Sequence, residues 1–224
     1  MKHIITGILL ISLISKSIGQ VATIEDKDGY TNVREEPNAK SKIVYQIKKG
    51  EVFWFAEEDY YSKEIDWIQV EISKNNYSLE CGSLDGLQGF VHKSKLKPLN
   101  KKEKYLGDEF VFEYVTKPFT ESNKIIDYQG QWISTINGLH PWGVTNENPE
   151  IEIEKISLTL NGNKIEVSDI LISDIYECNN QFNIYKTEDT YFVHQQNGKD
   201  SGAYEIVWVI SENKIKQRLI REVQ

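Results

Sequence analysis

The sequence predicts an all-β fold built from two small β domains, and three observations support this. Residues 65–72 alternate apolar and polar side chains, as in a strand with one buried face. Asn-Gly pairs at 161–162 and 197–198 favour tight hairpin turns, because both central residues of such a turn need a positive φ. The only helical candidate, at 169–177, is a short helix or an irregular connection, so strands must supply the architecture.

Residues 1–19 have the pattern of an export signal. A short basic start precedes the apolar run 4–14, and small residues stand at Ser17 and Gly19, where a signal peptidase reads the chain. We expect cleavage before Gln20 and therefore an exported, periplasmic or secreted protein. The apolar run is shorter than the roughly 20 residues that a permanent membrane anchor needs. The alternative is a buried N-terminal strand.

The expected mature chain is strongly acidic. Removal of Lys2 and Lys16 with the signal leaves 24 basic and 34 acidic residues, a formal charge of −10. Such a surface repels phosphate polymers and anionic lipid headgroups. We therefore expect no nucleic-acid partner, and no later stretch is apolar enough for a membrane span. A mature length of about 205 residues fits two small domains.

The first domain is expected over residues 20–100. Its longest connection is the polar stretch 73–88, which we interpret as a loop between two strands. Residues 96–99 close the domain, and the charged segment 100–104 is the best boundary in the chain. The alternative is a solvated turn inside a single domain. The second domain then covers residues 105–224.

Five motifs follow one another in residues 20–100. They are Tyr30-Thr31-Asn32-Val33-Arg34 with Pro37, the strand 43–50 ending in Lys49-Gly50, the aromatic strand 52–56, the Trp67 strand, and Gly89-Phe90-Val91-His92. This order resembles the bacterial SH3-like domain, a small β-barrel module of exported proteins. The resemblance implies a barrel that holds cell-wall peptides or positions a neighbouring domain. The long loop that contains Cys81 departs from the family, which has a short connection there.

The resemblance also implies structural roles for the motif residues. We expect Val33 to point into the barrel while Asn32 and Arg34 bond to neighbouring backbone, and we expect Trp67 to lie in the core. A ligand-binding role for the polar pair is the alternative. The full structural set is Asn32, Val33, Arg34, Gly50, Trp67 and Gly89.

Four aromatic residues are candidates for a shallow binding groove in the first domain. They are Tyr30, Trp54, Tyr60 and Tyr61, placed near the first loop and the strand tips. Tyrosine and tryptophan suit such a surface because each combines an apolar body with a polar tip. Packing in the core is the alternative for each.

The second domain is predicted to be an antiparallel β-sandwich or barrel, because short strands are joined by tight turns. It resembles uncharacterised β-rich exported bacterial proteins. The expected strands are 109–115, 131–136, 151–160, 164–167, 181–185, 191–195, 203–210 and 214–219.

A shaped loop is expected at residues 136–143. It contains two glycines, a proline, His140 and Trp142 between two strands. One interpretation is a binding loop with Trp142 at its tip and His140 beside it. The other is a structural plug in which Trp142 covers the open end of the sandwich.

Two cysteines, Cys81 and Cys178, lie in different predicted domains. An even number of cysteines in an exported chain favours a disulfide. A Cys81–Cys178 bond would join the two domains. The alternative is two separate thiols.

No catalytic residue, cofactor or metal site is predicted. Cys178 and His194 are the only plausible nucleophile and base in the second half, but the acidic neighbourhood of Cys178 disfavours the thiolate that the chemistry needs. His92, His140 and His194 stand far apart, with no metal-ligand spacing between them.

The sequence therefore predicts an exported, non-enzymatic binding or docking protein. Its SH3-like module would recognise a cell-wall peptide or an envelope protein, and the pattern gives no oligomeric state. One alternative is an envelope hydrolase with a site around His140, Trp142 and His194. A second is an inhibitor of basic enzymes, which only the acidic charge favours.

Overall fold

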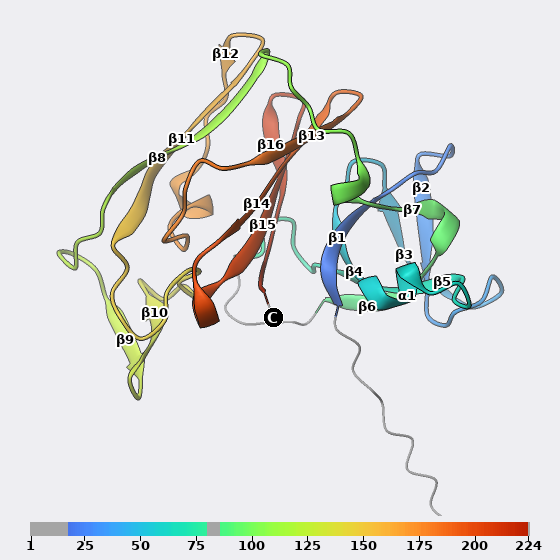
Figure 1. Ribbon diagram of the computed structural model, residues 1–224, viewed down its shortest axis with the longest axis horizontal. Coiled ribbons are helices and arrows are strands. Elements are labelled where there is room, and N and C mark those ends of the chain that lie inside the picture. The colour runs from blue at the N-terminus through green and yellow to red at the C-terminus, as the bar shows by residue number, and fades with distance from the viewer. Residues whose placement is uncertain (1–17, 80–85, 224) are drawn as a thin grey trace, which may run out of the picture.

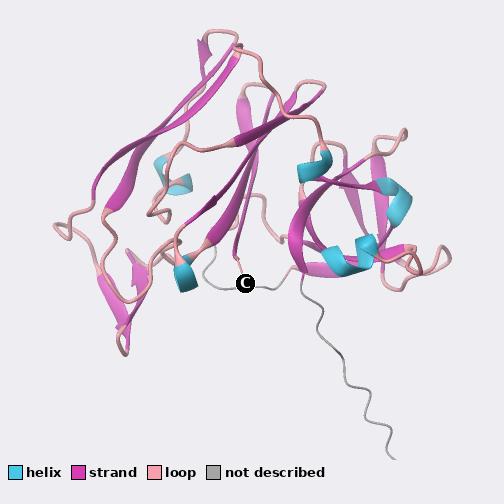
Figure 2. Ribbon diagram, in the orientation of Figure 1, coloured by secondary structure: helices cyan, strands magenta, loops and turns pink. Residues whose placement is uncertain are grey.

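The computed structural model describes residues 18–79 and 86–223 and confirms the all-β class. Two modules lie side by side (Figure 1), and helix is confined to short turns (Figure 2). Within these ranges, no helix combines the length and hydropathy that crossing a bilayer requires. Residues 1–17 of the predicted export signal lie outside the described residues, and Ile18 and Gly19 begin the first strand.

The N-terminal module is one seven-stranded sheet with the order β3-β2-β6-β5-β4-β1-β7. Its elements are β1 (Ile18–Ile24), β2 (Tyr30–Arg34), β3 (Ile43–Lys48), β4 (Phe53–Ala56), α1 (Glu57–Tyr61), β5 (Trp67–Ile72), β6 (Leu87–His92), η1 (Lys93–Lys95), β7 (Leu96–Pro98) and η2 (Leu99–Lys101). Every strand contributes to one buried apolar cluster, so the sheet must curl around that cluster. The edge strands are β3 and β7.

The residues of the Asn-Val-Arg segment contribute to this curled sheet. Val33 is fully buried in the cluster. The guanidinium of Arg34 donates from Nη1 to the carbonyl of Ser41 at 2.6 Å, which fixes the turn that follows β2. Asn32 instead accepts a bond from the side-chain amide of Gln46 at 2.9 Å. Its partner is therefore a side chain on β3 and not the backbone that the sequence suggested.

Glycine is needed at positions 50 and 89 of the motif set for different physical reasons. Gly50 has a φ of +91°, in the left-handed region that glycine adopts without a steric penalty. A Cβ on Gly89 would lie 2.5 Å from Cγ1 of Val33, so only a hydrogen fits where β6 crosses β2. The prediction that Trp67 lies in the core is wrong: the residue is only partly buried and lies outside the apolar cluster, and its ring meets that of His92 edge-on at 5.4 Å.

The C-terminal module contains three sheets, ordered β10-β9, β12-β11-β8 and β13-β14-β15-β16. Its elements are β8 (Phe110–Pro118), β9 (Ile126–Gln129), β10 (Trp132–Ile136), β11 (Ile151–Leu160), β12 (Asn163–Lys164), η3 (Asp169–Leu171), β13 (Asn183–Thr187), β14 (Thr190–Asn197), η4 (Asp200–Gly202), β15 (Tyr204–Ser211) and β16 (Lys214–Glu222). The β8–β11 pair packs across a large apolar cluster onto one face of the four-stranded sheet, as expected for a sandwich.

The four-stranded sheet is apolar on both faces, because its other face meets the N-terminal module. On β15, Ile206 and Trp208 point into the sandwich core, while Val207 and Val209 point into a second cluster. That second cluster also contains Trp54 and Val21 from the N-terminal module. The two modules therefore share a continuous apolar interface, with β13–β16 as the middle layer (Figure 1).

Trp54 belongs to this interface. It is 3% exposed, and the guanidinium carbon of Arg221 lies 4.9 Å from the centre of its ring. Arg221 also donates to a carboxylate oxygen of Glu71 at 2.6 Å. The prediction that Trp54 contributes to a ligand groove is therefore wrong for this structure, because the second module covers the ring.

Hydrogen bonds to backbone groups hold both the interface and the boundary segment. The side-chain amide of Gln217 accepts from the backbone N–H of Val52 at 2.9 Å and donates to its carbonyl at 2.8 Å. In the boundary segment, Tyr105 donates its N–H to the carbonyl of Ile184 at 2.8 Å. The charged segment 100–104 thus leads directly into a contact with β13 rather than into a free linker.

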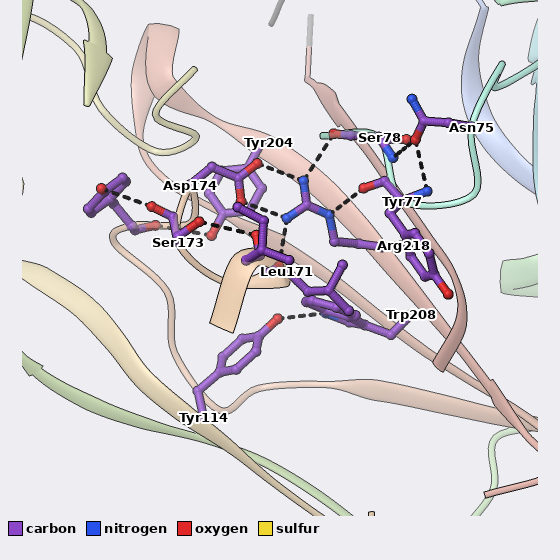
Figure 3. Close-up of polar contacts among 12 residues, drawn as sticks. Asn75, Tyr77, Ser78, Tyr114, Leu171, Ser173, Asp174, Tyr204, Trp208 and Arg218 are labelled. Atoms are coloured by element: carbon purple, nitrogen blue, oxygen red, sulfur yellow. Dashed lines mark hydrogen bonds and ion pairs between the residues drawn. The ribbon is translucent and has the colours of Figure 1, made fainter. Parts of the chain in front are cut away.

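A buried arginine fastens the long loop of the first module to the second module (Figure 3). Arg218 on β16 has no exposed side-chain surface, and its two terminal nitrogens form a two-pronged ion pair with Asp174, 2.6 Å on each side. The same guanidinium donates to the carbonyls of Tyr77 at 2.8 Å, Ser78 at 3.0 Å and Leu171 at 2.6 Å. All five N–H donors of the side chain are used.

The loop is shaped to present those carbonyls. The side chain of Asn75 accepts from the backbone N–H groups of Tyr77 at 3.0 Å and Ser78 at 2.6 Å, which is the local turn that asparagine favours. The carbonyl of Asn76 accepts from the backbone N–H of Arg218 at 2.7 Å. Residues 73–79 of the predicted 73–88 loop are therefore anchored; residues 80–85 lie outside the described residues.

The predicted strands of the second module recur with shifted ends. The elements not expected from the sequence include β1, which overlaps the predicted export signal at Ile18 and Gly19, the short helix α1, and β9, whose four residues are mostly exposed. In the stretch 169–177 only η3 is helical, so the irregular connection is the correct alternative there.

Replacing Arg218 by alanine should lower the free energy of unfolding by about 3–5 kcal/mol, because Asp174 would be left as an unpaired buried charge. Urea denaturation measures the change. Lys216→Ala is the matched control on the same strand, since its pair with Glu212 is exposed and worth at most about 1 kcal/mol. Equal losses in the two variants would contradict the anchoring role.

Trp54→Ala should also cost about 3–5 kcal/mol, because it removes a large buried ring from the interface between modules. The control is Trp132→Ala, since Trp132 is 49% exposed and its loss should change stability by at most about 0.5 kcal/mol. A Trp54→Ala protein as stable as the parent would show that the interface is not formed in solution.

Candidate functional site

A polar cleft of about 280 Å³ lies where the two modules meet. The N-terminal module forms one wall with β1, α1 and η2, and the C-terminal module forms the other with β14 and β15. The lining residues are Gly19, Gln20, Val21, Glu57, Glu58, Leu99, Asn100, His194, Gln196 and Glu205.

The first wall is positioned by strand pairing. β1 runs antiparallel to β4, with Gln20 opposite Phe55 and Ile18 opposite Ala56. α1 starts at the next residue, so the acidic first turn with Glu57 and Glu58 stands beside the beginning of β1. The side-chain amide of Asn100 donates to that of Gln20 at 3.2 Å, which links η2 to the same wall.

The second wall consists of a histidine and a glutamate on adjacent strands. Alternation along β14 places His194 on the same face as Phe192, which packs in the module interface. Glu205 shares that face with Val207. Nε2 of His194 lies 2.6 Å from a carboxylate oxygen of Glu205, and the two side chains are only 13% and 10% exposed.

The cleft is rich in hydrogen-bond acceptors. Three of its ten lining residues are glutamates, and none of the ten is lysine or arginine. In the tautomer that donates from Nε2 to Glu205, Nδ1 of His194 is an acceptor. This Nδ1 is buried without a hydrogen-bond partner in the described part of the chain. The site therefore suits a ligand that is cationic and rich in donors.

The aromatic residues predicted from the sequence do not form one groove. Tyr30 and Tyr61 are 43% and 50% exposed, and they stand at the start of β2 and the end of α1. Tyr60 is partly buried against the module core and meets Phe55 edge-on at 5.6 Å. Of the set, Tyr61 stays an exposed candidate on the helix whose first turn lines the cleft.

The 136–143 loop is held against the sandwich. Trp142 exchanges backbone bonds with Asp174 at 2.8 Å and Tyr176 at 2.9 Å, and its ring packs on the main cluster. His140 lies edge-on to Trp142 at 4.5 Å, and its Nε2 is 3.8 Å from a carboxylate oxygen of Glu222. Burial lowers the pKa of His140, which keeps the ring neutral at neutral pH.

The contacts of His140, Trp142 and His194 do not join these three residues into the single hydrolase site that the sequence offered as an alternative. Glu205 is the hydrogen-bonded partner of His194, whereas His140 lies beside Trp142 and Glu222. No hydrogen bond, ion pair or ring contact among the described residues brings His140 or Trp142 to His194.

Cys178 and His194 lie on opposite sides of the four-stranded sheet. Cys178 is 6% exposed inside the sandwich core, whereas His194 faces the other module. Burial raises the pKa of the Cys178 thiol to about 12, so it is a neutral thiol at physiological pH. The pair therefore lacks both the contact and the thiolate that nucleophilic catalysis needs.

The predicted disulfide is not confirmed. Cys178 is a free thiol, and Cys81 lies outside the described residues. In the part of the chain that the structure covers, no group of three or more His, Cys, Asp or Glu side chains is arranged to hold a metal ion.

Most of the cleft is not evident from the amino-acid sequence. The acidic triplet 57–59 was a visible signal for a charged surface, and the apolar run 206–210 indicates a strand buried on both faces. Together they predict a covered sheet and an acidic turn. They do not predict that the two meet, because that depends on how the modules pack.

Three comparisons with known proteins gave no match. No protein-family model matches the chain, no curated protein is similar to it, and no solved structure is similar to it. The class that the fold and the site define is thus an all-β, two-module protein with an acidic cleft at the module interface.

Burial of Cys178 predicts that its thiol resists alkylation. In a Cys81→Ser background, iodoacetamide at pH 8 should leave the native protein unlabelled and label the unfolded protein fully, because the thiolate fraction is very small. Mass spectrometry reads the result. Rapid labelling of the native protein would show that Cys178 is accessible and ionised.

Proposed function

We propose that this protein is an exported, non-enzymatic binding protein that holds a cationic, amine-bearing ligand in the cleft between its modules. The acceptor-rich lining carries the proposal: three glutamates and His194 line the cleft, without a lysine or arginine among the lining residues. A ligand ammonium would gain charge-assisted hydrogen bonds there. Cell-wall peptides with free amino groups are the ligand class that fits both this chemistry and the SH3-like resemblance.

The rigidity of the walls supports binding. The apolar interface next to the cleft holds the two modules at a fixed spacing, and the Gln217–Val52 bonds add backbone contacts across it. A preorganised site loses less conformational entropy when a ligand binds. The volume of about 280 Å³ accommodates an amino-acid side chain rather than a long polymer.

The lining residues argue against nucleophilic catalysis. They include no serine, threonine or cysteine, and the core thiol of Cys178 is on the far side of the sheet. This supports a non-enzymatic role.

An envelope hydrolase is the second candidate function, and one observation favours it. The His194–Glu205 pair has the geometry of a general base oriented by a carboxylate, which would have to activate water. Incubation with purified peptidoglycan and analysis of the soluble products separates the two functions. Product release that is lost in His194→Ala would replace binding by hydrolysis as the role of the cleft.

The proposal is tested with a pair of short peptides that contain lysine, one with a free side-chain amine and one acetylated at that amine. Calorimetry should show binding of the free amine only. The variant Glu57→Gln/Glu58→Gln should weaken it by about tenfold or more, which is about 1.4 kcal/mol. This loss should shrink as salt is added, because α1 is partly exposed.

Glu166→Gln is the matched control, since this glutamate is 82% exposed in its side chain and does not line the cleft. It should bind the peptide like the parent. Equal binding of the acetylated and free peptides would contradict an amine-binding cleft.

A further inference from the structure

Two independent observations concern the same residues at the beginning of β1. The sequence predicts cleavage of an export signal between Gly19 and Gln20, and both residues line the acidic cleft. From this coincidence we infer that the new α-amino group of Gln20 becomes a resident cation of the cleft, paired with the carboxylates of α1, so that export processing sets the charge of the binding site. The inference rests on the export and the cleft proposed above.

Strand pairing fixes where the new terminus would lie. Gln20 is opposite Phe55, and α1 begins two residues after Phe55. Val21, the next residue, is 4% exposed and packs in the module interface. The chain is therefore anchored one residue after the predicted cut, and its amino end cannot move far from Glu57 and Glu58.

The charge of the cleft changes with processing. In the unprocessed chain the nitrogen of Gln20 is a neutral amide. After the cut it is an amine with an ordinary pKa of about 7.7–8.0, so it is mostly cationic at neutral pH. The three glutamates of the lining carry a formal charge of −3, and the new amine reduces it to −2.

The carboxylates of the cleft favour the charged form of this amine, whereas Lys101 on η2, whose Nζ lies 5.7 Å from the ring centre of Tyr61, opposes it. α1 contributes Glu57 and Glu58, β15 contributes Glu205, and β14 contributes His194. The other polar lining side chains, Gln20, Asn100 and Gln196, are neutral amides. Nearby opposite charges favour the ammonium, so the pKa of the amine should rise on folding.

The raised pKa predicts a defined pH dependence of stability. A group whose pKa is higher in the folded state stabilises fully below its unfolded pKa, and this contribution is lost as pH rises through the folded value. The mature protein should therefore gain stability over an unprocessed form at neutral pH. The gain should disappear in alkaline solution once the amine is deprotonated.

The test compares residues 20–224 with the same chain extended by Ser-Gly before Gln20. The α-amine of each protein is labelled by reductive ¹³C-methylation and titrated by NMR. We expect the native terminus to titrate about one unit or more above the ordinary range of about 7.7–8.0. The extended terminus should titrate within that range. The thermal midpoint of the 20–224 protein should be higher at pH 7, and the difference should vanish at high pH.

Two variants identify the partners of the amine. Glu57→Gln/Glu58→Gln should return the titration to the ordinary range, whereas the exposed Glu166→Gln should leave it raised. An ordinary pKa in the 20–224 protein overturns the inference. So does a mature protein, purified from the exporting host, whose mass shows a different first residue.

One chemical outcome also overturns the inference. The amine of an N-terminal glutamine can attack its own side-chain amide carbon, with loss of ammonia, to give a neutral lactam. A mature protein lighter by one ammonia would carry no such cation. None of these results decides amine-peptide binding, which the calorimetry with free and acetylated peptides measures separately. Conversely, a raised α-amine pKa without peptide binding would reject only the proposed function.

Discussion

The four-stranded sheet β13–β16 has apolar side chains on both faces, and the need to cover both determines the arrangement of the molecule. One face is covered by the β8–β11 pair and the other by the N-terminal module. Burial of a large aliphatic or aromatic side chain contributes about 1.5–3 kcal/mol. Exposing Val207, Val209, Phe192 and Leu219 together would therefore cost an amount comparable with the whole stability of a small domain. The two modules act as one folded unit for this reason.

Because different parts of the molecule cover the two faces of the sheet, the two faces carry different kinds of side chain. Side chains alternate along β14 and β15, so His194 and Glu205 reach the module boundary while Tyr204 and Trp208 enter the sandwich. The apolar contact ends at the boundary of the interface, and polar groups take over there. The cleft is thus the polar margin of an apolar interface, and its acceptors are held in place by the same packing that joins the modules.

The local sequence pattern was sufficient to predict most strands, but it was insufficient to predict the contacts between the modules. Alternation predicted β5, and the Asn161-Gly162 turn predicted the end of β11, because those signals depend only on neighbouring residues. The tight turn expected at 197–198 is wrong: only Gly198 has a positive φ, and the longer segment 198–203 connects β14 to β15. Trp54 was misassigned because its exposure depends on a second module far away in sequence. Arg218 was not predicted to be buried for a related reason. Charged residues on a strand normally face solvent, and its burial is made favourable by the carbonyls of residues 77, 78 and 171 and the carboxylate of Asp174. The acidic cleft depends on the same non-local packing.

The contacts of β16 have a consequence for the order of folding. This strand carries Gln217, Arg218 and Arg221, whose partners in the first module and its loop are 165, 141 and 150 residues away in sequence. Until β16 pairs, the carbonyls of the loop and the carboxylate of Asp174 lack their donor. Contacts between segments so far apart in sequence slow folding, so both modules depend on a late, long-range step for their completion.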